Sequence, residues 1–143
     1  AAHCSAVGAA TMQSVQTITR YSNASRLYEG RSHMKLKASA RLVVNSENPE
    51  LPGTFSHGCV MLLDGVSRTK SLNKAAKELG MAYSKAWRLV KEAEGQLGYQ
   101  LLLRDGARGS SLTPEGARAV EAYRVLQDEI DELLRRRTPE LFG

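Results

Sequence analysis

The segment from residue 83 to residue 88 gathers hydroxyl and cationic side chains: Tyr83, Ser84, Lys85 and Arg88. On a helix these residues fall mostly on one outward face. Lysine and arginine donate hydrogen bonds to guanine O6 and N7 or to phosphate, and tyrosine and serine hydroxyls reach phosphate. Such a group favours recognition of a nucleic acid over catalysis. A solvated helix face is the alternative, and Lys85 and Arg88 alone would leave that alternative favoured.

A short helix and a glycine turn come directly before this group. Ser71 is a good N-cap for a helix over Leu72–Leu79, in which Leu72, Ala75, Ala76 and Leu79 form one apolar stripe. The adjacent alanines allow another helix to approach closely. Gly80 suits the left-handed position that ends a helix. The sequence therefore predicts a helix and a tight turn ahead of the polar group.

The polar group opens a second helix, predicted over Ala82–Gln96. Its inner face is supplied by Ala86, Leu89 or Val90, Ala93 and Leu97, with Trp87 as a large anchor. The cationic and hydroxyl side chains lie in the N-terminal half. That half is the part that a recognition helix inserts into a major groove.

A hairpin is predicted after this helix, with a strand over Tyr99–Leu103, a turn over Asp105–Ser111 and a return strand beginning at Ser111–Leu112. In a winged fold, residues 104–112 would lie beside the duplex, where Arg108 would meet the DNA backbone or enter the minor groove. The candidate DNA-binding residues are Ser71, Lys74, Tyr83, Ser84, Lys85, Arg88, Arg108 and Ser110.

A long helix is predicted from the Thr113 N-cap and Pro114 to about Arg137. Apolar residues recur in it at heptad-like spacing, which favours self-association. A helix of about 23 residues is about 35 Å long, more than so small a domain needs. The candidate dimerisation residues are Tyr123, Leu126, Ile130 and Leu133.

Ahead of the motif, alternating apolar residues predict a strand over Lys35–Asn45, with a short return strand at Gly53–Phe55 and a helix from Ser56 or His57. We expect residues 1–33 to be a vector-derived tag or a disordered extension, because Ser32–Met34 looks like a cloning scar. The predicted domain covers 34–137, and 138–143 is a tail.

Charge and composition favour an anionic partner and argue against a metal site, a membrane span and a cofactor site. The net charge is +5, and the stretch Ser67–Arg108 holds nine Lys or Arg against four acids. Cys4 and Cys59 are far apart and the three histidines do not join them at ligand spacing, so no zinc site is expected. We take Cys59 as a buried apolar residue in a reducing compartment. No membrane span, nucleotide-binding loop or cofactor site is expected, and an enzyme is the weakest interpretation.

The chain from about Lys35 to Ile130 resembles the N-terminal DNA-binding domain of ModE-type molybdate-responsive transcription regulators. The resemblance rests on SLNKAAKELGMAYSKAWRLV and on SLTPEG at Ser111–Gly116. LysR-type regulators share the wing and the LTxxG ending. Ala82 stands where family members often have serine, a loss of about 1 kcal/mol of helix capping. The resemblance implies a dimer on a palindromic operator, but no residues here look like an oxyanion site, so molybdate binding is not expected in this chain.

These observations predict a mainly α fold with a small β wing, a winged helix-turn-helix with a long C-terminal dimerisation helix. The predicted function is a cytoplasmic, dimeric, sequence-specific transcription regulator that binds double-stranded DNA, with helix 82–96 in the major groove and wing 104–112 on the backbone or minor groove. The competing hypothesis is a winged-helix module that binds proteins and not DNA.

Overall fold

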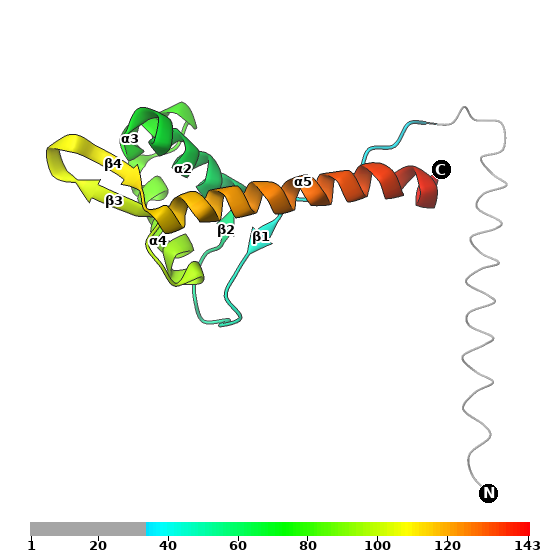
Figure 1. Ribbon diagram of the computed structural model, residues 1–143, viewed down its shortest axis with the longest axis horizontal. Helices are drawn as coiled ribbons and strands as arrows, with labels where there is room; N and C mark the ends of the chain where they lie inside the picture. The colour runs from blue at the N-terminus through cyan, green and yellow to red at the C-terminus, as the bar shows by residue number, and fades with distance from the viewer. Residues whose placement is uncertain (1–33) are drawn as a thin grey trace, which may run out of the picture. The chain divides into compact units, whose positions relative to one another are not determined.

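The computed structural model describes residues 34–143, so the predicted tag or extension and Cys4 lie outside the described residues. In chain order the elements are β1 (Val43–Val44), β2 (Phe55–Ser56), α2 (His57–Thr69), α3 (Leu72–Glu78), α4 (Tyr83–Leu97), β3 (Leu102–Asp105), the 3-10 turn η1 (Gly106–Arg108), β4 (Gly109–Leu112) and α5 (Pro114–Phe142) (Figure 1). All of them lie within the unit Leu36–Gly143. The predicted fold class, mainly α with a small β wing, is confirmed.

The core is built around α2. Leu62, Leu63 and Val66 of this helix are fully buried, and burial of each such side chain contributes about 1.5–3 kcal/mol. Helix α3 packs closely on α2 because small residues meet there: a Cβ atom added to Gly65 would lie 2.8 Å from the Cβ atom of Ala75. The close approach expected from the paired alanines is therefore present, and it fixes α3 on the core.

The strand predicted over Lys35–Asn45 is mostly wrong. Only Val43 and Val44 pair with another strand, antiparallel to β2, with Val43 opposite Ser56 and Val44 opposite Phe55. The alternation of burial expected for a strand is present over residues 41–46, although only Val43 and Val44 of these pair with a strand. The return strand is present, two residues later than predicted.

The segment before β1 is bound to α5 by side chains in place of a strand partner. The backbone N–H of Leu42 donates to Gln127 Oε1 at 2.9 Å, and Gln127 Nε2 donates to the carbonyl of Ala40 at 2.8 Å. The hydroxyl of Tyr123 donates to the carbonyl of Leu42 at 2.9 Å. One amide and one phenol therefore satisfy the backbone groups that a strand ladder would otherwise satisfy.

Tyr123 lies in the core of its own chain. Its side chain is 3% exposed, and its ring meets Phe55 edge to face, with the centroids 5.8 Å apart. The prediction that Tyr123 belongs to a dimer seam is therefore wrong, because its ring packs on Phe55 and its hydroxyl binds Leu42 within the same chain. The heptad-like spacing at Tyr123 reports core packing, whereas Leu126 and Leu133 are exposed.

Helix α5 continues beyond its predicted end at Arg137. It runs 29 residues to Phe142 and includes Pro139, so residues 138–142, predicted as a tail, are helical. Proline removes one backbone donor and usually breaks a helix. Here Pro139 stands only one turn from the end, and its carbonyl accepts from the N–H of Gly143 at 3.0 Å.

Candidate nucleic-acid interface

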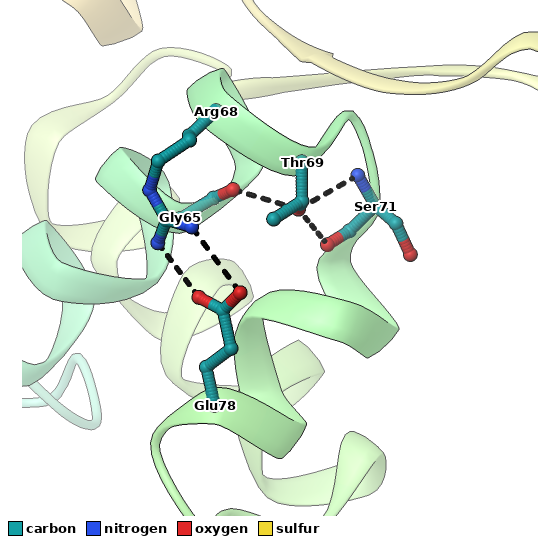
Figure 2. Close-up of polar contacts among 5 residues, drawn as sticks. All are labelled: Gly65, Arg68, Thr69, Ser71 and Glu78. Carbon is teal, nitrogen blue, oxygen red and sulfur yellow. Dashed lines mark hydrogen bonds and ion pairs between the residues drawn. The ribbon is translucent and has the colours of Figure 1, made fainter.

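The corner between α2 and α3 is fixed by hydroxyl groups. Thr69 Oγ1 donates to the carbonyl of Gly65 at 2.7 Å and accepts from the N–H of Ser71 at 3.3 Å (Figure 2). Ser71 Oγ then caps α3, accepting from the N–H of Lys74 at 3.2 Å, as the sequence predicted. Between them, Lys70 adopts a left-handed conformation with φ of 60°. The start of α3 is therefore set by local hydrogen bonds.

An ion pair joins the two helices at the other end of α3. Arg68 Nη2 lies 2.6 Å from Glu78 Oε2 and Arg68 Nη1 lies 3.2 Å from Glu78 Oε1, a bidentate arrangement that Figure 2 shows. The hydrogen bond from Arg68 lowers the pKa of the Glu78 carboxyl below its ordinary value. Because both side chains are exposed, this pair orients α3 more than it stabilises the fold.

The turn from α3 to α4 is a Schellman motif. Gly80 has φ of 65°, its N–H donates to the carbonyl of Lys77 at 3.0 Å, and the N–H of Met81 donates to the carbonyl of Ala76 at 2.9 Å. This pattern satisfies carbonyls that the end of α3 would leave unpaired. The predicted role of Gly80 is confirmed. Leu79 caps the helix and is 37% exposed, so its predicted place in the buried stripe is wrong.

Helix α4 presents the polar group outward. Ala86, Val90 and Ala93 are fully buried on its inner face. The four predicted readers are exposed: Tyr83, Ser84, Lys85 and Arg88. The helix spans Tyr83–Leu97, one residue later than predicted, and its N-cap Ala82 makes no side-chain hydrogen bond. The amphipathic geometry of the predicted recognition helix is therefore present.

The wing is a hairpin in which Arg104 faces Ser110 and Leu102 faces Leu112. Its first strand begins three residues later than predicted, and ahead of it Leu101 is buried while Tyr99 is exposed. The N–H of Ser110 donates to the carbonyl of Lys70 at 2.9 Å. A Cβ atom at position 109 would lie 2.2 Å from that same carbonyl oxygen, so glycine is required there.

A hollow of about 570 Å³ lies where α3, α4 and the wing meet. It is lined by Ser71, Leu72, Asn73, Tyr83, Arg104, Gly106, Gly109 and Ser110. The structure thus brings together three predicted site residues, Ser71, Tyr83 and Ser110. The other five are exposed but do not line the hollow: Lys74, Ser84, Lys85, Arg88 and Arg108.

Five lining residues were not among the predicted site residues, and two of them, Asn73 and Arg104, have polar side chains. The sequence does indicate a cation at the base of the predicted wing, because Arg104 follows directly after three leucines. Its guanidinium Cζ lies 4.5 Å from the centroid of the Trp87 ring and 5.7 Å from that of Tyr83. No local sequence pattern indicates that contact.

Most cations on this surface have no acidic partner. Among residues 34–143, none of Lys74, Lys85, Arg88 and Arg104 has a carboxylate oxygen within 4.0 Å. Arg108 at the wing tip lies 3.8 Å from Asp105, and both side chains are largely exposed. The surface therefore offers positive charge that its own chain does not neutralise, as a phosphate backbone requires.

The described part of the chain holds no assembled metal or nucleophile site. Within residues 34–143, no three His, Cys, Asp or Glu side chains come together as metal ligands. Cys59 is 2% exposed, and burial raises the pKa of its thiol to about 12. A thiol with that pKa is not a nucleophile near neutral pH. No helix described here is both long and apolar enough to cross a membrane.

Comparison with solved structures finds the CbnR DNA-binding domain in complex with DNA, at 24% sequence identity and a TM-score of 0.49, covering 58% of this chain and 94% of that one. Among curated proteins, the molybdenum transport protein ModE of Herbaspirillum seropedicae is 34% identical over 79 residues, 52% of this chain and 29% of that protein. An uncharacterised HTH-type transcriptional regulator of Mycobacterium bovis is 38% identical over 76 residues, 51% of this chain and 24% of the regulator. The chain therefore spans less than a third of the length of these two curated relatives.

The family of bacterial regulatory helix-turn-helix proteins of the LysR type matches residues 60–117. That range begins within α2 and ends just after the start of α5, so it contains the corner, both helices of the motif and the whole wing. Residues 60–117 therefore match a regulatory helix-turn-helix domain of the LysR type, and in this structure they form a helix-turn-helix with a wing.

Proposed function

We propose that this chain is the DNA-binding part of a transcription regulator and that α4 enters the major groove of double-stranded DNA. The observation that carries the proposal is the exposed, unpaired group at the start of α4, with Lys85 and Arg88 at its centre. These side chains would donate to base edges or phosphates, while Tyr83 and Ser84 would contact the backbone. The match of residues 60–117 to a regulatory helix-turn-helix family supports it.

The wing and α3 would contact the phosphate backbone on either side of α4. Arg108 at the wing tip would meet a phosphate or enter the minor groove, and Ser110 would lie near the backbone. At the start of α3, Ser71 and Lys74 would add phosphate contacts. Such a binding function needs no catalytic step. We expect a protein that binds chromosomal DNA in this way to act in the cytoplasm, with the chromosome.

We infer that α5 pairs two copies of the chain. Val125, Leu126 and Leu133 are 44–49% exposed on a helix that extends far beyond the core. Leu126, Ile130 and Leu133 follow one another at heptad spacing. A second α5 helix would therefore cover these three side chains. Two recognition helices would then meet half-sites about one DNA turn, roughly 10 base pairs, or a multiple of a turn apart.

The test is selection of DNA by the purified chain. Fragments of genomic DNA that survive repeated capture are sequenced, and the enriched site is confirmed by gel shift. The proposal expects one inverted repeat with the spacing above. Captured DNA without any common site, or no captured DNA, would contradict it and favour a module that binds a protein partner. The Lys85→Ala/Arg88→Ala variant, checked for fold by circular dichroism, is the control.

A further inference from the structure

Trp87 links two elements of the interface. It is the single tryptophan of the chain, half-buried on α4 and packed against the core. Two cations lie over its ring: Lys91 Nζ and Arg104 Cζ, each 4.5 Å from the ring centroid. Lys91 belongs to the same helix and pairs with the buried Glu94 at 2.9 Å. Arg104 comes from β3 of the wing, so this contact joins the wing to α4.

Arg104 has a second aromatic contact on the same helix. Its Cζ lies 5.7 Å from the ring centroid of Tyr83, in the first turn of α4. Cation–π contacts at exposed sites contribute a factor of about two to five each to an equilibrium constant. A guanidinium stacks by its plane and keeps its N–H groups at the edge, so stacking leaves them able to bind phosphate.

The two strands of the wing attach to two different helices. Arg104 and Ser110 are direct cross-strand partners. Arg104 contacts α4 through its guanidinium, and the N–H of Ser110 donates to the carbonyl of Lys70 at the end of α2. Beyond this pair the hairpin continues to the exposed Arg108. Arg104 therefore links the wing to α4 at a point between the recognition helix and the wing tip.

We propose that Arg104 is a positioning residue that couples the wing to the recognition helix through Trp87 and Tyr83. The proposal rests on the proposed DNA-binding function and deepens it. When Arg104 holds the wing, Arg108 and the residues of α4 bind one DNA backbone as a single surface. Without Arg104, the wing tip moves independently and Arg108 contributes little to affinity.

The first test uses the free protein, so it does not depend on DNA. Arg104→Ala should change the emission of Trp87 and raise hydrogen exchange of the wing amides by about two- to five-fold. Arg108→Ala removes an arginine of the same wing that has no ring contact, and it should change neither. If Arg104→Ala leaves the emission or the wing exchange at wild-type values, the coupling is overturned.

The second test is a double-mutant cycle on DNA affinity. If Arg104 positions the wing, Arg108→Ala costs affinity in the wild type and little in the Arg104→Ala background. Losses that multiply in the double variant overturn the coupling, since the two arginines then act independently. A wild type that binds no DNA contradicts the proposed function instead, and the free-protein test still decides whether Arg104 couples the two elements.

Discussion

The surface formed by α3, α4 and the wing is rich in cations, and so is helix α5. The two regions differ in what their cations contact. On α5, four of the arginines have a carboxylate partner: Arg118 with Glu115, Arg124 with Asp64, Arg135 with Glu132 and Arg137 with Glu140. On the surface of α3, α4 and the wing, Lys85, Arg88 and Arg104 have none among residues 34–143.

The difference agrees with the two roles proposed for this chain, DNA binding and self-association. Free cations attract a polyanion, whereas paired cations keep a helix solvated without attracting one. Helix α5 also exposes apolar side chains at heptad-like spacing, Leu126 and Leu133. We therefore propose the first region as the DNA-binding surface and the second as the surface that pairs with a second copy of the chain. Changes confined to one region should leave the function of the other intact.

The largest expected effect comes from removing two free cations. Lys85→Ala with Arg88→Ala should lower affinity for the selected DNA site about 100-fold, because each lost contact is worth about tenfold or more. The matched control is Arg135→Ala with Arg136→Ala, which removes the same charge from α5. Equal losses of gel-shift affinity in both variants would show that only net charge matters.

The second largest effect is expected on the stability of the fold and not on the affinity for DNA. Gln127→Leu leaves the N–H of Leu42 and the carbonyl of Ala40 without their partner, so the free energy of unfolding should fall by about 1–3 kcal/mol. Urea denaturation measures this, with the exposed Glu121→Gln as control. A loss no greater than the control's would mean that the amide does not hold the segment before β1. Affinity for DNA, measured below the transition, should stay unchanged.

Self-association should respond to the apolar face of α5. Leu126→Glu with Leu133→Glu would place charges in the proposed interface and raise the dimer dissociation constant at least about tenfold. Val43→Glu changes a side chain of similar exposure, 50%, on β1 and serves as control. Analytical ultracentrifugation decides the matter. A wild type that is monomeric at every concentration would contradict the pairing through α5.

The smallest effect concerns the exposed pair between α2 and α3. Arg68→Ala should lower the urea midpoint slightly near neutral pH. Because Arg68 lowers the pKa of Glu78 in the folded state, the pair stabilises the fold above the ordinary carboxyl pKa. That contribution disappears as the pH falls through the lowered pKa. The difference between Arg68→Ala and wild type should therefore shrink in acid, whereas a constant difference would argue against the pair.

The helix-turn-helix itself could be predicted from neighbouring residues in the sequence. The caps at Ser71 and Thr113 and the left-handed Gly80 follow from side-chain chemistry within three residues, and each is present. The outward face of α4 follows from its helical period, because Ala86 and Val90 face the core. These features depend on sequence neighbours, so the sequence contains them.

Features that depend on distant partners were missed. Gln127 binds Leu42 across 85 residues, and this contact replaces the ladder that the alternation from Lys35 predicted. The same packing buries Tyr123, which heptad spacing alone assigned to a dimer. The stacking of Arg104 on Trp87 joins a strand to a helix, and neither element's periodicity indicates it. Spacing within one element cannot show which other element covers it.

The salt dependence of DNA affinity tests the central claim most directly. If the unpaired cations of α3, α4 and the wing contact phosphates, the logarithm of the association constant falls linearly with the logarithm of salt concentration, by about 0.9 for each phosphate neutralised. The slope should be shallower by about one for each phosphate-contacting cation removed in Lys85→Ala/Arg88→Ala, and unchanged in Arg135→Ala/Arg136→Ala. Affinity that does not vary with salt, or the same slope in all three proteins, would contradict the account.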